Sequence, residues 1–214
     1  MDTDRDIQAV VFDQDGTLIN TFIPAMRAYS AVTGRDIGLA ELEPVAHLGA
    51  ARNLVSALLG RPATDADDDA FHDALADAVA GVEPYPGIIA LLRELREAGL
   101  GTGVATNSDA RSAAVVLGAS GLDVLMDTVV TVDQVSGPKP NPESIQLAVR
   151  QLGVTPDKVA FVGDSRADMQ AARAAGVLAI AAGWGQQTPG IPQDGFDLIA
   201  DTPADVARLV RGVG

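Results

Sequence analysis

Short apolar runs alternate with stretches of helical hydrophobic spacing along most of this 214-residue chain. The apolar runs are nearly continuous, which is typical of strands covered on both faces of a parallel sheet. We expect strands at Ile7–Phe12, Gly103–Thr106, Thr128–Val132, Val159–Val162, Val177–Ala181 and Asp197–Ile199. Their alternation with helices predicts an α/β protein with a doubly wound, mainly parallel, Rossmann-like sheet as its core.

The segments between these strands carry signals for where helices begin and end. An i, i+3, i+4, i+7 stripe is formed by Ile88, Leu91, Leu92 and Leu95. Gly99 supplies a stop for that helix. Asn141 and Pro142 have the residue types of an N-cap and a first helical position. Ser165 and Asp168 have capping-box spacing, which predicts the start of another helix.

One long segment breaks the alternation of strands and helices. From about residue 21 to residue 83 the chain is rich in Ala and Leu, with breaks near Gly34, Gly49 and Gly60, and it shows no strand pattern. We interpret residues 21–83 as a helical cap domain inserted into a core made of residues 1–20 and 84–214. Pro84 and Pro86 mark the return to the core.

The charge of the chain limits its partners. Fifteen basic residues face 29 acidic ones, for a formal net charge of −14. Nucleic acid and anionic membranes are therefore unexpected partners, because binding them needs clustered Lys and Arg. An anionic substrate would need a local positive charge, and a divalent cation is the simplest source. Oligomeric state is left open between monomer and dimer.

Cellular location is suggested by what the sequence lacks. There are no cysteines, which excludes disulfides and thiolate metal sites and fits a cytoplasmic protein. No apolar run approaches the roughly 20 residues that span a bilayer. The N-terminus is acidic and leads directly into a strand, so it does not have the pattern of a signal peptide.

Reactive side chains follow the ends of the predicted strands. They are Asp13, Asp15, Thr106, Asn107, Lys139, Asp164 and Asp168. In open α/β sheets the ligand crevice lies at the carboxyl ends of the strands, so these segments should converge on one site. Three of the acids, Asp13, Asp164 and also Asp168, are hard oxygen ligands that suit Mg²⁺. Thr106 and Lys139 are donors of the kind that hold phosphate oxygens.

A bound cation would also solve an electrostatic problem. A carboxylate that approaches a phosphoryl oxygen at about 4 Å meets a repulsion of roughly 4 kcal/mol per charge pair at an effective dielectric of 20. A bridging Mg²⁺, helped by Lys139, reverses the sign of that interaction.

Four motifs together resemble those of the haloacid dehalogenase-like hydrolases. They are Asp13-Gln14-Asp15-Gly16-Thr17-Leu18, Thr106-Asn107, Lys139-Pro140 and Gly163-Asp164-Ser165-Arg166-Ala167-Asp168. The match runs in the family's order over about residues 10–185, with helical material inserted after the first motif. It is most similar to the branch of phosphoglycolate phosphatase and β-phosphoglucomutase.

The resemblance implies a role for each residue. Asp13 would be the nucleophile and a metal ligand. Asp15 would be the general acid/base and lend its backbone carbonyl to the metal. Phosphoryl binding would fall to Thr106, Asn107 and Lys139. Asp164 would bind Mg²⁺, and Asp168 would be a second metal-site acid acting through water, besides its place in a capping box. The implied substrate is a small phosphorylated metabolite, a phosphoglycolate-like compound or a sugar phosphate, cleaved through an aspartyl-phosphate.

An acid at position 15 separates reactions within the family. It can protonate a leaving oxygen and then activate water, which phosphate-ester cleavage needs and carbon–halogen displacement does not. The acid therefore favours a phosphatase or a phosphomutase over a dehalogenase. We take a phosphatase as the main interpretation, with a phosphomutase or a catalytically silent binding paralogue as alternatives. A response-regulator receiver also combines such residues, but the helical insertion does not fit it.

Some conspicuous residues have plainer interpretations. Arg52, just after a turn at Gly49, is a candidate contact for a substrate anion, or else an exposed helix arginine. The acids at 65–69 with His72 and Asp73 resemble a metal cluster, but a solvated helix start is favoured. We expect Gln14 to point away from both acids of its motif, His47 to be partly buried and Trp184 to serve packing.

Overall fold

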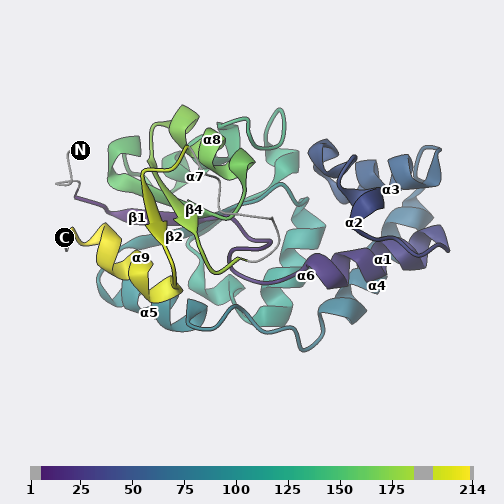
Figure 1. Ribbon diagram of the computed structural model, residues 1–214, viewed down its shortest axis with the longest axis horizontal. Helices are drawn as coiled ribbons and strands as arrows, with labels where there is room; N and C mark the ends of the chain where they lie inside the picture. The colour runs from purple at the N-terminus through teal and green to yellow at the C-terminus, as the bar shows by residue number, and fades with distance from the viewer. Residues whose placement is uncertain (1–5, 186–194, 213–214) are drawn as a thin grey trace.

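A computed structural model describes residues 6–185 and 195–212 and contains one parallel sheet (Figure 1). The strand order is β3-β2-β1-β4-β5-β6. The strands are β1 (Ala9–Phe12), β2 (Gly101–Ala105), β3 (Thr128–Val130), β4 (Val159–Gly163), β5 (Leu178–Ala182) and β6 (Leu198–Ala200). All neighbouring strands pair in parallel. The predicted α/β class is confirmed, and each predicted strand is present with ends that differ by one or two residues.

The central strand β1 is buried because helices cover both faces of the sheet. Val10 and Phe12 point into one apolar cluster, and Ala9 and Val11 point into the other. Alternating direction along a strand explains why a continuous apolar run is needed here. Val11 lies opposite Gly103 of β2 and Phe161 of β4, so β1 is paired with a strand on each side.

The helices divide between the two faces of the sheet and a separate layer. The bounds are α1 (Phe22–Thr33), α2 (Leu39–Leu42), α3 (Ala51–Leu59), α4 (Asp65–Val79), α5 (Ile88–Glu97), α6 (Ala110–Ser120), α7 (Glu143–Gln151), α8 (Arg166–Ala175) and α9 (Pro203–Val210). Short 3₁₀ turns occur at Ala46–Leu48, Asp123–Leu125, Val132–Gln134 and Pro156–Lys158. Helices α5 and α9 contribute to the first apolar cluster, and α7 and α8 to the second.

The predicted helix signals hold in most places. The stripe of Ile88, Leu91, Leu92 and Leu95 is buried in the first cluster. The capping box is present, because the Ser165 hydroxyl accepts from the Asp168 N–H and Asp168 accepts from the Ser165 N–H. The expected start of α7 was wrong by one position, since Pro142 is its N-cap. Asn141 still accepts from the Glu143 N–H at 3.0 Å, as a capping side chain does.

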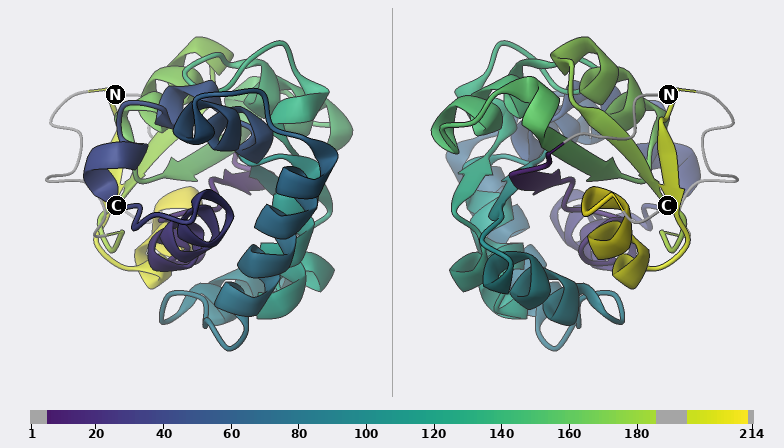
Figure 2. Two further views of the ribbon diagram at one scale, coloured as in Figure 1. Left: turned by 90° about the vertical axis from the view of Figure 1, so that its right-hand side faces the viewer. Right: turned by 90° about the vertical axis from the view of Figure 1, so that its left-hand side faces the viewer.

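Helices α1 to α4 form a layer at one end of the molecule, opposite α9 (Figures 1 and 2). They share their own apolar cluster, which includes Tyr29, Leu54, Phe71 and Leu75. The chain enters and leaves this layer at neighbouring points, because Ile19 bridges to Pro84 and the Tyr85 N–H donates to the Leu18 carbonyl at 3.0 Å. The cap boundaries at residues 21–83 stay a prediction.

Within the described residues, no helix is both long and apolar enough to cross a bilayer.

Candidate active site

The side chains that follow β1 and β4 meet at the carboxyl edge of the sheet. Asp13 follows β1, and Asp164 follows β4, its neighbour in the sheet. Asp13, Asp164 and Asp168 each present an oxygen atom, and these three atoms lie within 4.8 Å of one another. The parallel pairing of β1 and β4 therefore brings together residues that are about 150 positions apart in sequence.

Lys139 lies at the centre of this cluster and is buried. Its Nζ donates to Asp13 Oδ1 at 2.6 Å and to the Ala105 carbonyl at 2.9 Å, and it pairs with Asp168 Oδ1 at 2.6 Å. Burial alone would lower the pKa of Lys139, but Asp13 and Asp168 outweigh it and raise that pKa. The lysine is therefore a permanent positive charge in the site.

The acids are poorly compensated by that single ammonium group. Burial raises the pKa of Asp13 well above its ordinary value; Lys139 opposes this shift, and Asp168, Asp164 and Asp15 add to it. Burial and the charge of Asp168 also raise the pKa of Asp164, to about 7. Three clustered carboxylates with a single lysine, and Asp15 nearby, make a site that favours a further cation.

Two glycines allow the acids to come this close. Gly16 has a φ of 93°, and a Cβ there would lie 2.4 Å from Asp164 Oδ2. A Cβ on Gly163 would lie 2.6 Å from the Cβ of Asp168. The turn after β1 and the end of β4 thus need glycine for space, and Gly16 also needs it for its backbone conformation.

Three donors hold the carboxylate of Asp15. Thr21 Oγ1 donates to Oδ1 at 2.5 Å and Ser108 Oγ donates to Oδ2 at 2.9 Å. Gln14 Nε2 lies 3.2 and 3.3 Å from the two oxygens. The expectation that Gln14 points away from both acids was wrong: the backbone leaves β1 at Asp13, so strand alternation no longer fixes the direction of the next side chain.

Thr106 and Asn107 organise the loop after β2. Thr106 is buried, and its Oγ1 accepts from the Ser108 N–H at 3.0 Å. Asn107 Oδ1 accepts from the Lys139 N–H at 2.7 Å. The second motif therefore ties the lysine loop to the sheet edge and sets the position of Ser108, which in turn contacts Asp15.

Asp168 serves two structural partners at once. Its Oδ2 accepts from the Ser165 N–H and hydroxyl at 3.0 and 2.6 Å, completing the capping box of α8. Its Oδ1 forms the ion pair with Lys139. The Asp168 carboxylate can therefore cap α8 and also belong to the acidic cluster, because α8 begins at the edge of that cluster.

A cavity of about 300 Å³ lies between this edge and the helical layer. Asp15, Asn107 and Ser108 line it on the core side, together with Asp109. The opposite wall comes from α1, α3 and α4 and is mostly apolar, with Phe22, Leu54, Phe71 and Leu75 among its residues. A volume of this size is at the lower end of small-molecule sites.

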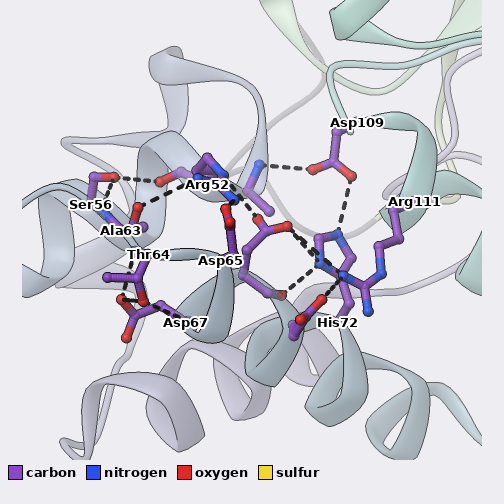
Figure 3. A network of polar contacts seen from close by, with 12 residues as sticks. Arg52, Ser56, Ala63, Thr64, Asp65, Asp67, His72, Asp109 and Arg111 are labelled. Carbon is purple, nitrogen blue, oxygen red and sulfur yellow. Dashed lines mark hydrogen bonds and ion pairs between the residues drawn. The ribbon is translucent and has the colours of Figure 1, made fainter.

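Arg52, the candidate anion contact, is not among the residues that line the cavity. Its guanidinium pairs with Asp65 at 2.6 Å and with Asp68 at 3.6 Å, and it donates to the Ala63 carbonyl (Figure 3). Asp65 lies at the start of α4 with its side chain 94% exposed. Whether Arg52 contacts substrate stays a prediction.

His72 connects the helical layer to the core (Figure 3). It is buried, and its Nε2 lies 3.2 Å from Asp109 Oδ1, while Asp109 Oδ2 accepts from the Ala51 N–H at 3.0 Å. The acids around it form no metal cluster within the described part of the chain, where the only such group is that of Asp13, Asp164 and Asp168. His47 is exposed, and its expected partial burial was wrong because its 3₁₀ turn lies at the surface.

For some residues at the site, no role was predicted from the sequence. Thr21 and Asp109 fall at an ordinary helix start, and Ser108 follows the second motif without being part of it. The only available signal was position, since Ser108 and Asp109 directly follow Thr106-Asn107. Trp184 packs as expected, and its indole N–H also donates to the Thr17 carbonyl at 2.8 Å.

A comparison with known protein families identifies the group to which this arrangement belongs. The family model described as haloacid dehalogenase-like hydrolase matches residues 7–176, which hold all four motifs. The chain belongs to this family.

Two relatives of similar length within the haloacid dehalogenase-like hydrolases are named as phosphatases. The chain is 33% identical to N-acetylmuramic acid 6-phosphate phosphatase of Pseudomonas aeruginosa, over 95% of each chain. It is 34% identical to phosphoglycolate phosphatase of Rhodospirillum rubrum, over 92% of this chain and 97% of the relative. The fold resembles that of CbbY from Rhodobacter sphaeroides, solved with phosphate, with a TM-score of 0.81 and 24% identity over 94% of this chain and 96% of the other.

Proposed function

We propose that this chain is a Mg²⁺-dependent phosphatase that hydrolyses a small phosphomonoester through an aspartyl-phosphate on Asp13. One observation carries the proposal: Asp13 is buried at a strand end, 2.6 Å from Lys139 and next to Asp164 and Asp168. The family and the phosphatase relatives support a phosphoric monoester hydrolase. Their names favour hydrolysis over the mutase alternative.

The residues present suit a magnesium ion. Asp13 and Asp164 offer hard carboxylate oxygens at a spacing one cation can bridge, and Asp168 offers a third. Asp15 adds its backbone carbonyl in this proposal. When bound, the ion would neutralise charge on the phosphoryl oxygens and align the ester with the nucleophile.

The reaction then divides into two displacements. A carboxylate oxygen of Asp13 attacks phosphorus, the ester P–O bond breaks, and Asp15 gives a proton to the leaving alcohol oxygen. Water then loses a proton to Asp15 and attacks the same phosphorus, which releases inorganic phosphate and restores Asp13. In the structure Thr21 and Ser108 hold Asp15, so it must exchange these bonds when it turns to the ester.

Phosphoryl binding falls to residues around the nucleophile. Lys139 and the hydroxyl of Thr106 are the donors, with Asn107 positioning the lysine loop through its contact with the Lys139 N–H. Lys139 already contacts Asp13, so it lies where charge on the phosphoryl group would develop. The cytoplasmic location expected from the absence of cysteine is part of this proposal.

The test is phosphate release from p-nitrophenyl phosphate with Mg²⁺ and with chelator. We expect activity only with the metal, and a loss of more than about 10³-fold in Asp13→Asn. Rapid acid quench and peptide mass analysis should show one phosphoryl group on the peptide that contains Asp13. Full activity of the Asp13→Asn variant would rule out the covalent route, and sugar-phosphate isomerisation without free phosphate would show a mutase.

A further inference from the structure

The cavity beside Asp15 has a wall without positive charge. Among the described residues, those that line it include no Lys, Arg or His. The half that faces the sheet edge contributes Asp15 and Asp109, and the other half is aromatic and aliphatic, including Phe22, Phe71 and Leu75. The Tyr29 and Phe71 rings pack against each other, with centroids 4.6 Å apart.

The acid at the side of the cavity is held in its charged form. Burial of Asp109 works against its charge, but the N–H groups of Ser112 and Ala51 and the ring of His72 outweigh it and lower the pKa of Asp109. The rim of the cavity therefore carries fixed negative charge near neutral pH. A leaving group with a carboxylate or a second phosphate would meet this charge without a cation to pair with it.

Two arginines next in sequence to lining residues, Arg52 beside Ala51 and Arg111 beside Ser112, pair with acids that do not line the cavity. Figure 3 shows Arg52 and Arg111 with their acidic neighbours. Arg52 pairs with Asp65 and Asp68. Arg111 pairs with Asp69 at 2.6 Å and lies 3.9 Å from Asp68. Drawing either one into the cavity would break these pairs and leave part of the acid run of α4 uncompensated.

We propose that the cavity accepts the uncharged alcohol part of the ester, one with apolar surface, and discriminates against anionic leaving groups. This rests on the proposed function and narrows its substrate class. Of the two substrate classes expected from the sequence, a phosphate ester of an uncharged sugar or other neutral alcohol fits this cavity, and one with a carboxylate such as glycolate does not. Both relatives described above are named for substrates with a carboxylate, so the proposal separates this chain from them. Serine, asparagine and acidic side chains at the sheet edge can meet hydroxyl groups, while the opposite wall covers carbon.

The experiment compares phenyl phosphate with 4-carboxyphenyl phosphate under saturating Mg²⁺. The two esters have the same ring and reacting bond, and the carboxylate makes the phenol a slightly better leaving group. We expect kcat/KM for phenyl phosphate to be higher by about tenfold or more, against that chemical trend. Equal or better turnover of the carboxylate ester would overturn the proposal.

A positive charge placed on the cavity wall by substitution provides a second test of the proposal. Ala46 lines the cavity and is exposed, so a longer side chain there does not disturb the core. In Ala46→Arg the preference should shift toward the carboxylate ester by about tenfold relative to wild type, and Ala46→Gln, which is polar but neutral and somewhat shorter, should not shift it. The same shift in both variants would show that size, not charge, sets the preference, and would contradict the proposal.

A binding measurement separates this proposal from the proposed function. If neither ester releases phosphate, the phosphatase proposal fails, and the cavity is tested by calorimetry with phenylphosphonate and 4-carboxyphenylphosphonate. Tighter binding of the neutral compound would still support the inference. Equal binding, tighter binding of the carboxylate or no binding of either compound would overturn it.

Discussion

The two sides of the candidate site are built in opposite ways. On the sheet side, the buried Lys139 contacts both Asp13 and Asp168. Asp13 follows a strand end, Asp168 lies at a helix start, and Lys139 lies in the loop before α7. On the helical side, the wall is apolar, and its charged residues face outward in exposed pairs such as that of Arg52 and Asp65. The difference indicates that chemistry is concentrated on the sheet, while the helices define the shape of what can be bound.

The energetics of the two sides differ as well. A buried ion pair loses several kcal/mol when one partner is removed, because the other charge stays in a medium of low polarity. An exposed pair contributes about 0–1 kcal/mol. Substitutions on the sheet side should therefore change activity and stability together, whereas exposed charges of the helical layer should tolerate change.

After Asp13→Asn, the largest effect is expected from the lysine at the centre of the cluster. Lys139→Met removes the only ammonium group in contact with Asp13 and Asp168 in the described structure. We expect phosphate release to fall by about 10²–10³-fold, as for other donors that stabilise a developing charge. The chain has a second lysine, Lys158, whose side chain is 38% exposed and 3.7 Å from Asp6. Equal losses of phosphate release in Lys139→Met and Lys158→Met would contradict the expectation that the buried lysine matters more for activity than the exposed one.

A smaller effect should appear in the pH dependence of stability. Because the pKa of Asp164 is about 7 when folded and near 3.8 when unfolded, the folded protein keeps a proton that the unfolded chain releases between these values. Stability of the metal-free protein should therefore fall as pH rises from about 4 to 7. In Asp164→Asn this contribution is absent, so the variant should melt higher than wild type at pH 8, with little difference at pH 4.

The size of that effect follows from the length of the chain. In a protein of this length, a change of about 1 kcal/mol in the free energy of unfolding moves the melting temperature by roughly 2–4 °C. Each such change caused by the charged Asp164 should therefore be measurable by calorimetry with chelator. Mg²⁺ should stabilise wild type at pH 8 and have little effect on Asp164→Asn. Asp77→Asn, an exposed acid of α4, is the matched control. If Asp164→Asn melted at a lower temperature than wild type at pH 8, the charged Asp164 carboxylate would not be destabilised by its neighbours.

The smallest effect should come from Gln14. Its amide contacts both oxygens of Asp15 at the long end of hydrogen-bond distances, and its own Oε1 is buried without a partner in the described structure. Gln14→Leu should therefore change stability by less than about 1 kcal/mol, because it removes a weak contact and an unsatisfied atom together. We expect kcat to fall only about two- to fivefold if the amide helps to orient Asp15. A loss as large as that of Lys139→Met would show that Gln14 acts on the chemistry itself.

The sheet and its reactive edge were predictable because each depends on local patterns. Apolar runs located the strands, and the first polar residues after them, such as Asp13 and Asp164, lie at one edge because parallel strands share their direction. The role of Ser165 and Asp168 in starting α8 was also encoded within four residues.

The rest could not be predicted because it depends on contacts between distant segments. No local pattern indicates that Thr21 and Ser108 meet at Asp15, or that His72 meets Asp109 across the helical layer and the core. The direction of Gln14 was predicted wrongly because the strand ends at the residue before Asp13. The partners of Arg52 depend on where α4 packs, which the Ala- and Leu-rich pattern of that region leaves open.

The neighbouring crossing points of the chain, where Ile19 bridges to Pro84, have a consequence for how such enzymes diversify. Because the excursion starts and ends at nearly one place, the backbone joins the helical layer to the sheet at two adjacent points, besides side-chain contacts such as that of His72 with Asp109. An entire helical segment could be exchanged for that of a relative without moving a strand of the sheet. Under the proposed function, new substrates could then be selected by changes in the helical layer, while the reacting groups at the sheet edge stay unchanged.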